Sequence, residues 1–161
     1  MPLDVRQAWQ RYHSPVREKC RRVLGDGDEA NDVAQETFIR FWKWEGARTG
    51  DARAALSWLY RTATHLAVDR LRQRAMHGRA VPMATETSNL ESAAASRQLL
   101  SRISAQASEE ELQAAVLNRI DGLTQPEVAR LMNISERTVR RLLERFDGLA
   151  PGPGSEEEVR A

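Results

Sequence analysis

The segment from residue 124 to residue 146 reads TQPEVARLMNISERTVRRLLERF. Thr124 and Glu127 have the spacing of a capping box, in which a hydroxyl and a carboxylate each bond a backbone amide at the start of a helix. Asn133 tolerates a left-handed backbone, and Ser135 can cap a second helix. The segment therefore predicts two short helices that begin after Thr124 and after Ser135 and are joined by a tight turn.

These two predicted helices, over residues 125–132 and 136–146, have the arrangement of a DNA-binding helix-turn-helix. Apolar side chains fall where two steeply crossing helices bury them against each other, at Val128, Met132, Ile134, Val139 and Leu142. The outward face of the second helix carries Glu136, Arg137, Arg140, Arg141 and Glu144. Arginines on such a face can bond guanine edges in the major groove or bind phosphates. Ordinary packing of a helix pair remains an alternative.

A further helix is predicted upstream, where Ser108 is followed by three glutamates in a second capping pattern. The carboxylates are favourable at the positive end of the helix dipole, and no His, Cys or metal partner accompanies them. Capping is therefore preferred to catalysis. This helix should carry Leu112, Val116 and Ile120 inward and end near Gly122.

Turn-forming residues at 25–27 and 45–51 divide residues 1–80 into three or four predicted helices. Residues 81–92 contain one proline and little helical periodicity, so they are interpreted as a linker. A helical pattern resumes over residues 93–148, and the Gly-, Pro- and Glu-rich residues 149–161 are expected to be disordered. The predicted fold class is all-α: two small helical lobes joined by a flexible linker, with the helix-turn-helix in the C-terminal lobe.

Residues 29–44 read EANDVAQETFIRFWKW and predict an amphipathic helix. Its apolar stripe consists of Ala34, Phe38 and Phe41, flanked by Val33, Thr37 and Trp42. The opposite side carries Asp32, Gln35, Glu36, Ile39 and Arg40. Carboxylate and amide groups beside an exposed isoleucine can dock on a basic protein surface, although such a grouping is more often a solvated face.

Residues 57–74 read SWLYRTATHLAVDRLRQR and predict a second long helix. Its apolar stripe consists of Leu59, Ala63, Leu66, Ala67 and Leu71. The other face carries Tyr60, Arg61, Thr64, His65, Val68 and Arg72. Aromatic rings stack on unpaired bases, at about 1 to 3 kcal/mol each, while arginines follow the backbone, so this face is suited to single-stranded nucleic acid. Alternatively, Trp58 and Tyr60 anchor the helix within its own lobe.

The net charge of +1 conceals an uneven distribution along the chain. Residues 1–80 contain 15 Lys/Arg and 10 Asp/Glu, a net charge of +5, whereas residues 81–161 contain 9 and 13, a net charge of −4. The basic residues gather in two patches, one from Arg61 to Arg79 and one from Arg137 to Arg145. Two patches suggest two contacts with a polyanion, but two solvated helix faces would give the same pattern.

Composition excludes several classes of protein. Of the 161 residues, 41% are apolar, 29% charged and 6% aromatic, which favours a soluble helical protein. No run approaches the roughly 18 apolar residues of a membrane span, and the first residues lack a signal-peptide pattern, so we expect a cytoplasmic protein without membrane insertion. The lone Cys20 and the scattered His13, His65 and His77 offer neither an internal disulfide nor a metal site. No nucleophile with a base, carboxylate pair or phosphate loop is visible, so neither a cofactor nor enzymatic activity is expected.

Several motifs together resemble those of the extracytoplasmic-function (ECF) sigma factors of bacterial RNA polymerase. They are DVAQETF at residues 32–38, WLYR-x-A at 58–63, D-x-LR at 69–72, GLT-x-x-EVA at 122–129 and TVR at 138–140. The resemblance spans nearly the whole chain, and the order and spacing of the motifs make it specific. This chain has His65 where the family usually has asparagine, and Asn133 where a turn glycine is common.

The resemblance implies a role for each part of the chain. Residues 1–80 would be sigma region 2, which binds core polymerase and recognises and melts the minus-ten element; residues 93–148 would be sigma region 4, which recognises the minus-thirty-five element. The implied polymerase-binding residues are Asp32, Gln35, Glu36 and Arg40. The implied minus-ten residues are Tyr60, Arg61, His65 and Arg72, and the implied minus-thirty-five residues are Arg137, Thr138, Arg140 and Arg141. The implied partners are core RNA polymerase, promoter DNA and an anti-sigma factor.

Two other interpretations compete with this one. A LuxR-type helix-turn-helix regulator would bind a palindrome as a dimer without polymerase, and would leave the face around Gln35 and Glu36 without a role. A helical module that only sequesters a protein partner would not need Arg140 and Arg141.

Overall fold

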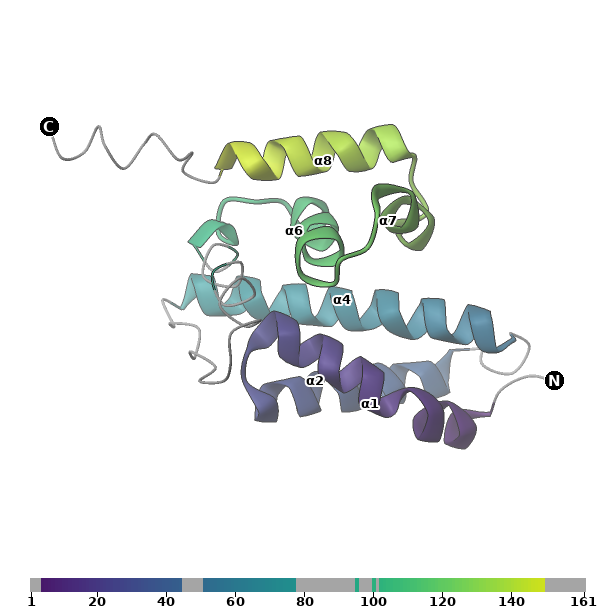
Figure 1. Cartoon of the computed structure of the whole chain (residues 1–161). Helices are drawn as coiled ribbons and strands as arrows, with labels where there is room; N and C mark the ends of the chain where they lie inside the picture. Colours follow the sequence, from purple (N-terminus) through teal and green to yellow (C-terminus); the bar gives the residue numbers. More distant parts are fainter. Residues whose placement is uncertain (1–3, 45–50, 78–94, 96–99, 101, 150–161) are drawn as a thin grey trace, which may run out of the picture.

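A computed structural model of the chain describes residues 4–44, 51–77, 95, 100 and 102–149. Over these residues every regular element is a helix, which confirms the all-α prediction (Figure 1). The N-terminal lobe consists of α1 (Val5–Leu24), α2 (Gly27–Lys43) and α4 (Ala52–Met76). The C-terminal lobe contains α6 (Glu109–Ala115), the π-helical turn η1 (Val116–Ile120), α7 (Gln125–Met132) and α8 (Glu136–Leu149).

An aspartate begins each helix of the N-terminal lobe. The side chains of Asp4, Asp26 and Asp51 accept hydrogen bonds from backbone amides of the first turn. Gly25 ends α1 with a φ of 72°, a left-handed conformation that glycine adopts without a steric penalty. The break predicted at residues 25–27 is therefore confirmed, whereas most of the one at 45–51 lies outside the described residues.

The apolar stripe of α2 packs into the core of this lobe, with one exception. Phe38 and Phe41 are buried as predicted, but Trp42, expected beside them, is 70% exposed. The reason is that other rings occupy the space next to Phe41. The Trp58 ring lies 5.5 Å from that of Phe41 and stacks on Trp44 at 5.1 Å between centroids. Trp58 thus anchors α4 to its own lobe.

The C-terminal lobe has the predicted helix-turn-helix. α7 begins after Thr124, whose hydroxyl accepts a hydrogen bond from the Glu127 amide at 3.3 Å. Asn133 ends α7 with a φ of 56°, in the predicted left-handed conformation. Val128 and Val139 are fully buried where the two helices meet. Ser108 and Glu111 form the predicted capping box at the start of α6.

Two local features of this lobe differ from the predictions. The helix that begins after Ser108 ends in the π-helical turn η1, which the sequence pattern did not indicate. α8 continues to Leu149, beyond the predicted end at residue 146. Its last turn is held because Phe146 is buried and because Arg119 of η1 pairs with Asp147 at 2.7 Å. The predicted linker at 81–92 and residues 150–161 of the predicted tail lie outside the described residues, whereas Leu149, assigned to that tail, is helical.

The two lobes pack against each other. Figure 1 shows α6 between α4 and α8, and α6 contacts both helices. The buried cluster of the N-terminal lobe continues into Leu112, Ala115 and Val116 of the C-terminal lobe. Thr64 and Val68 of α4, predicted on an accessible face, are consequently buried. That prediction was wrong because α4 is covered on a second side.

Candidate nucleic-acid interface

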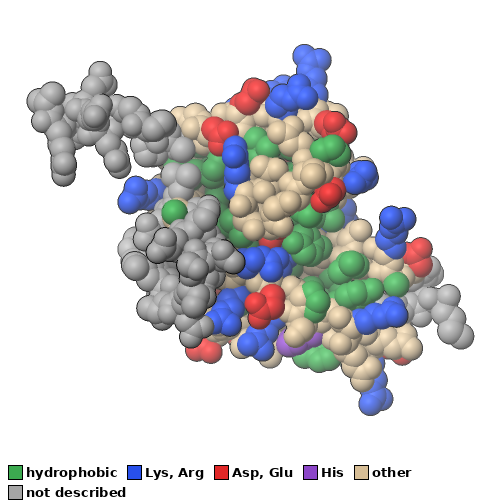
Figure 2. Space-filling model, viewed as in Figure 1, with side chains coloured by type: hydrophobic (Ala, Val, Ile, Leu, Met, Phe, Trp, Pro, Cys, Tyr) green, Lys and Arg blue, Asp and Glu red, His purple; other side chains and the backbone are tan. Residues whose placement is uncertain are grey.

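The outer face of α8 carries an exposed arginine surface, which we define as Arg137, Arg140 and Arg141. Figure 2 shows Lys and Arg side chains gathered over α8 on the outer edge of the molecule. Within the described part of the chain these three arginines form no ion pair. Their guanidinium groups are therefore available to phosphates or base edges.

The start of α8 fixes the orientation of this surface. Ser135 accepts a hydrogen bond from the Thr138 amide at 3.1 Å, and its hydroxyl lies 2.8 Å from that of Thr138. The opposite side of α8 is anchored by Leu142 and Leu143, which are both buried. A helix held in this way presents its arginines on a rigid support, with Thr138 half-buried at the rim.

The second candidate surface, on α4, consists of Tyr60, Arg61, His65 and Arg72. Arg61 and His65 are exposed, whereas Tyr60 and Arg72 are half-buried. Nδ1 of His65 lies 2.7 Å from Nε2 of Gln113 and 3.7 Å from a Glu109 carboxylate oxygen, both on α6. Burial raises the pKa of Tyr60 above the ordinary value for tyrosine. The structure brings the four residues onto one helix but places Tyr60 and His65 against the other lobe.

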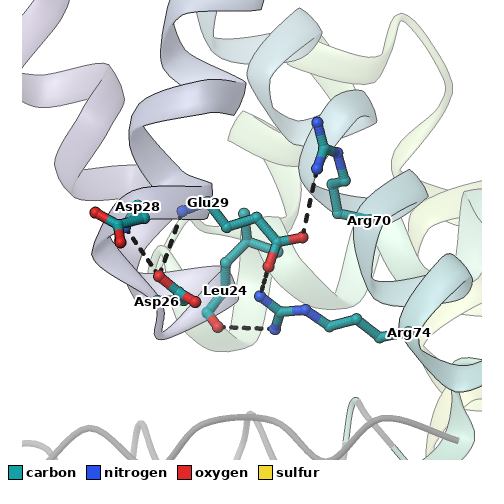
Figure 3. Close-up of polar contacts among 6 residues, drawn as sticks. All are labelled: Leu24, Asp26, Asp28, Glu29, Arg70 and Arg74. Carbon is teal, nitrogen blue, oxygen red and sulfur yellow. Dashed lines mark hydrogen bonds and ion pairs between the residues drawn. The ribbon is translucent and has the colours of Figure 1, made fainter.

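Not every arginine of the predicted basic patch faces solvent, as Figure 3 shows. Arg74 is 7% exposed, donates a hydrogen bond to the Leu24 carbonyl at 2.9 Å and pairs with Glu29. Arg70 lies 3.7 Å from the same carboxylate. Asp26 in turn accepts hydrogen bonds from the amides of Asp28 and Glu29, at 2.9 and 3.3 Å. The interpretation of Arg74 as a polyanion contact was therefore wrong, because it joins α4 to the junction of α1 and α2.

The third candidate surface lies on α2. Asp32, Gln35 and Arg40 are exposed, and Glu36 is half-exposed with its carboxylate 3.2 Å from the Arg40 guanidinium. Ile39, on the same side, is 46% exposed. The predicted combination of acid, amide and isoleucine on one solvent-facing side is present.

Sequence reasoning missed one feature of this region, the buried contact between Lys19 of α1 and Asp121, which follows η1. Both side chains are 0% exposed and form an ion pair between the lobes. A signal existed, because Lys19 lies on the apolar stripe of α1 with Val16 and Val23, where a lysine needs a buried partner. Nothing in the local pattern identified Asp121 as that partner, since 102 positions separate the two residues.

Comparisons with known proteins agree with this architecture. Residues 8–76 match the family model Sigma-70 region 2, and residues 106–151 match the Homeodomain-like domain. The ECF RNA polymerase sigma-E factor of Salmonella typhimurium is 31% identical over 149 residues, which cover 81% of this chain and 75% of that protein. The sigma factor SigM of Mycobacterium tuberculosis is 27% identical over 139 residues, covering 83% and 68%. SigL of the same species is 29% identical over 147 residues, covering 86% and 82%.

A region 2 lobe followed by a helix-turn-helix lobe defines a sigma-type transcription factor, a class of proteins that are not enzymes. The chain belongs to the ECF RNA polymerase sigma factors, the family named by the predicted resemblance. As a member it directs transcription initiation with core RNA polymerase, and its family implies promoter DNA as the second partner. The match of residues 8–76 also gives the N-terminal lobe a role that a LuxR-type regulator would lack. Across the residues that the structure describes, no helix is long and apolar enough to cross a membrane.

Proposed function

We propose that three separate surfaces divide the work of initiation. The exposed side of α2 binds core polymerase, the α4 surface holds the non-template strand of the minus-ten element, and the α8 arginine surface reads the minus-thirty-five element as duplex. One observation carries this proposal: α2 and α8 each bury one side in the fold, α4 is covered on two sides, and all three helices leave their candidate residues wholly or partly accessible.

The α2 surface suits a basic partner. Asp32 and Glu36 supply carboxylates, and Gln35 supplies an amide that can both donate and accept hydrogen bonds. Ile39, which is also exposed, adds an apolar contact. A polymerase surface that presents arginines would pair with the carboxylates through charge-assisted hydrogen bonds. The Glu36 and Arg40 pair is exposed on both sides, so exchanging Arg40 for an arginine of the partner would cost little.

The two DNA surfaces are weak separately. Opening duplex DNA costs about 1.4 kcal/mol per stacked step. Each base captured on an aromatic ring returns about 1 to 3 kcal/mol. Neither lobe therefore has a large surplus, and polymerase makes binding tight by tethering both lobes at fixed spacing, which raises their effective concentration. We expect little promoter affinity from the free protein.

We further propose that the protein works in the cytoplasm and that an anti-sigma factor holds it inactive until a signal arrives. Both statements rest on the resemblance to ECF sigma factors, whose members are usually regulated in this way.

Run-off transcription with purified core polymerase and upstream DNA from the protein's own operon tests the assignment. We expect a specific start with the wild type and loss of that start with the double variant Gln35→Ala, Glu36→Ala. The control is Gln10→Ala, Glu18→Ala, which removes the same chemical groups from exposed positions on α1. Normal initiation by the α2 double variant would refute the docking surface, and absence of any specific start with the wild type would refute the whole assignment.

A further inference from the structure

An exposed apolar patch lies where α1 and α2 pack side by side (Figure 1). The Trp9 ring, 39% exposed, stacks on His13 at 3.9 Å between centroids and meets Phe38 of α2 edge-on at 5.0 Å. One turn beyond Phe38, Trp42 is 70% exposed, and its neighbour Ile39 is 46% exposed. Three of the five exposed large apolar side chains in the described part of the chain therefore belong to this patch. Such a concentration marks a protein interaction surface.

A basic strip continues the patch along α1. Arg17 and Arg21 follow His13 at intervals of four residues, so they lie on the same side of the helix. Arg21 is exposed and Arg17 is half-buried. Neither forms an ion pair with a residue that the structure describes. Both guanidinium groups can therefore pair with carboxylates of a partner.

An acidic strip lies beside it on α2. Asp28 and Asp32 are one turn apart, and Asp32 is two turns from Ile39, so both lie on the side of α2 that carries Ile39. Both aspartates are exposed, and neither forms an ion pair within the described chain. We call the patch and the two strips together the helix-pair face.

The helix-pair face is self-complementary. α1 and α2 are joined by a short turn and run antiparallel. Phe38 contacts both Trp9 and His13, at 5.0 and 5.9 Å between ring centroids. Equal distances along the two helices from this contact bring Arg17 level with Asp32. A two-fold rotation about an axis along the helix pair therefore places the basic strip of one copy opposite the acidic strip of another, with patch on patch, as an isologous dimer requires.

We propose that the free protein forms a two-fold dimer through the helix-pair face, with the apolar patches at the centre and arginine–aspartate contacts on both sides. The face is about 25 Å long and about 20 Å wide, so a dimer buries about 500 Å² of each copy. An interface of about 1,000 Å² in total belongs to the weak, transient class. The dissociation constant is therefore expected in the micromolar range, and assembly depends on protein concentration.

The dimer competes with polymerase for α2. Asp32 is one of the residues assigned to polymerase binding, and Gln35 and Ile39 continue the same side of α2 toward Trp42. A second copy on this face would cover them, so only the monomer would bind core polymerase. This consequence rests on the proposed role of α2, whereas the dimer itself does not. The dimer would hold surplus sigma factor in a form that cannot initiate, and dilution or polymerase would release it.

Sedimentation velocity of the full chain through the micromolar concentration range measures the assembly. We expect the average mass to rise from that of the monomer toward twice that mass, and to rise less in high salt. Trp42→Ala should raise the dissociation constant at least about tenfold, because a tryptophan at the centre of an interface is commonly a hot spot. Its side chain is mostly exposed in the monomer, and far-UV circular dichroism checks that the variant is folded.

An exchange of charges identifies the face. Arg17→Glu places a carboxylate opposite the partner copy's Asp32, and Asp32→Arg places a guanidinium opposite the partner copy's Arg17. Each variant alone should therefore dimerise at least about tenfold more weakly. An equimolar mixture of the two should regain the dimer, because every facing pair then has opposite charges. Arg11→Glu is the matched control and should leave the constant unchanged, since Arg11 is exposed but lies two residues from Trp9, on another side of α1.

A wild type that stays monomeric, a mixture that stays monomeric, or wild-type association by Trp42→Ala would each overturn the proposal. A monomeric wild type whose transcription is impaired by Trp42→Ala would assign the patch to polymerase instead.

Run-off transcription separates failure of the dimer from failure of the polymerase surface. If the chain is monomeric and Gln35→Ala, Glu36→Ala impairs initiation, the polymerase surface stands and only the dimer falls. If the wild type dimerises and that double variant initiates normally, the dimer stands and the polymerase surface falls.

Discussion

Arg74 is predicted to stabilise the fold without contacting DNA, and Arg74→Met tests this. Methionine keeps the apolar stem of the side chain and removes the guanidinium group. The loss includes the hydrogen bond to the Leu24 carbonyl, about 1.5 to 3 kcal/mol for a charged donor. The Glu29 carboxylate also loses its ion pair with Arg74. This loss adds at most about 1 kcal/mol, because Glu29 is 20% exposed and Arg70 remains 3.7 Å from its carboxylate. We expect a total destabilisation of about 1.5 to 4 kcal/mol.

Urea unfolding followed by far-UV circular dichroism measures this loss. Arg61→Met is the control, because Arg61 is an exposed arginine on the same helix and should change stability by less than about 0.5 kcal/mol. The two variants should show the opposite order in transcription, where Arg61→Met lowers initiation at a temperature at which both are folded. An Arg74→Met protein within about 0.5 kcal/mol of wild type, at unchanged denaturant slope, would refute the structural role of Arg74.

Three further outcomes are expected. Arg140→Ala should weaken binding of polymerase holoenzyme to minus-thirty-five duplex by about 1 to 3 kcal/mol in a gel-shift titration, with unchanged thermal stability; an unaffected Kd would exclude Arg140 from the interface. Gly122→Ala should cost about 1 to 2 kcal/mol in thermal unfolding, because Gly122 has a φ of 73°, which alanine adopts only with strain. No neighbour would clash with the added methyl group, so the backbone conformation alone sets this cost, and an unchanged Tm would contradict it. Burial raises the pKa of Cys20 from 9.0 to about 11, so the thiol loses its proton at a lower pH in the unfolded state than in the folded state. Deprotonation therefore favours unfolding, and the free energy of unfolding should fall as the pH rises from 9.0 through about 11. The fall should be shallower in Cys20→Ala, and equal slopes would count against a buried thiol.

The helix-turn-helix was predictable because its signals are local. Thr124 and Asn133 act through their own backbone neighbours, and Val128 and Val139 lie at helical spacings that identify the buried side. The arginine surface of α8 follows directly, since burial of one side of a helix exposes the other. The roles of Arg74 and Lys19 were not predictable in this way. Each depends on a partner distant in sequence, Glu29 for Arg74 and Asp121 for Lys19.

The composition of α4 nevertheless carried a signal of its second covered side. A helix with a single buried stripe has polar side chains around the rest of its surface. On α4, Val68 extends the apolar arc beyond the stripe of Ala63, Ala67 and Leu71, and Thr64 satisfies its own hydroxyl by bonding the Tyr60 carbonyl at 2.8 Å. A threonine paired in this way and a valine can be buried without an unsatisfied polar group. This wide arc indicates that α4 is covered on two sides, once by its own lobe and once by the C-terminal lobe, which Tyr60 and His65 contact.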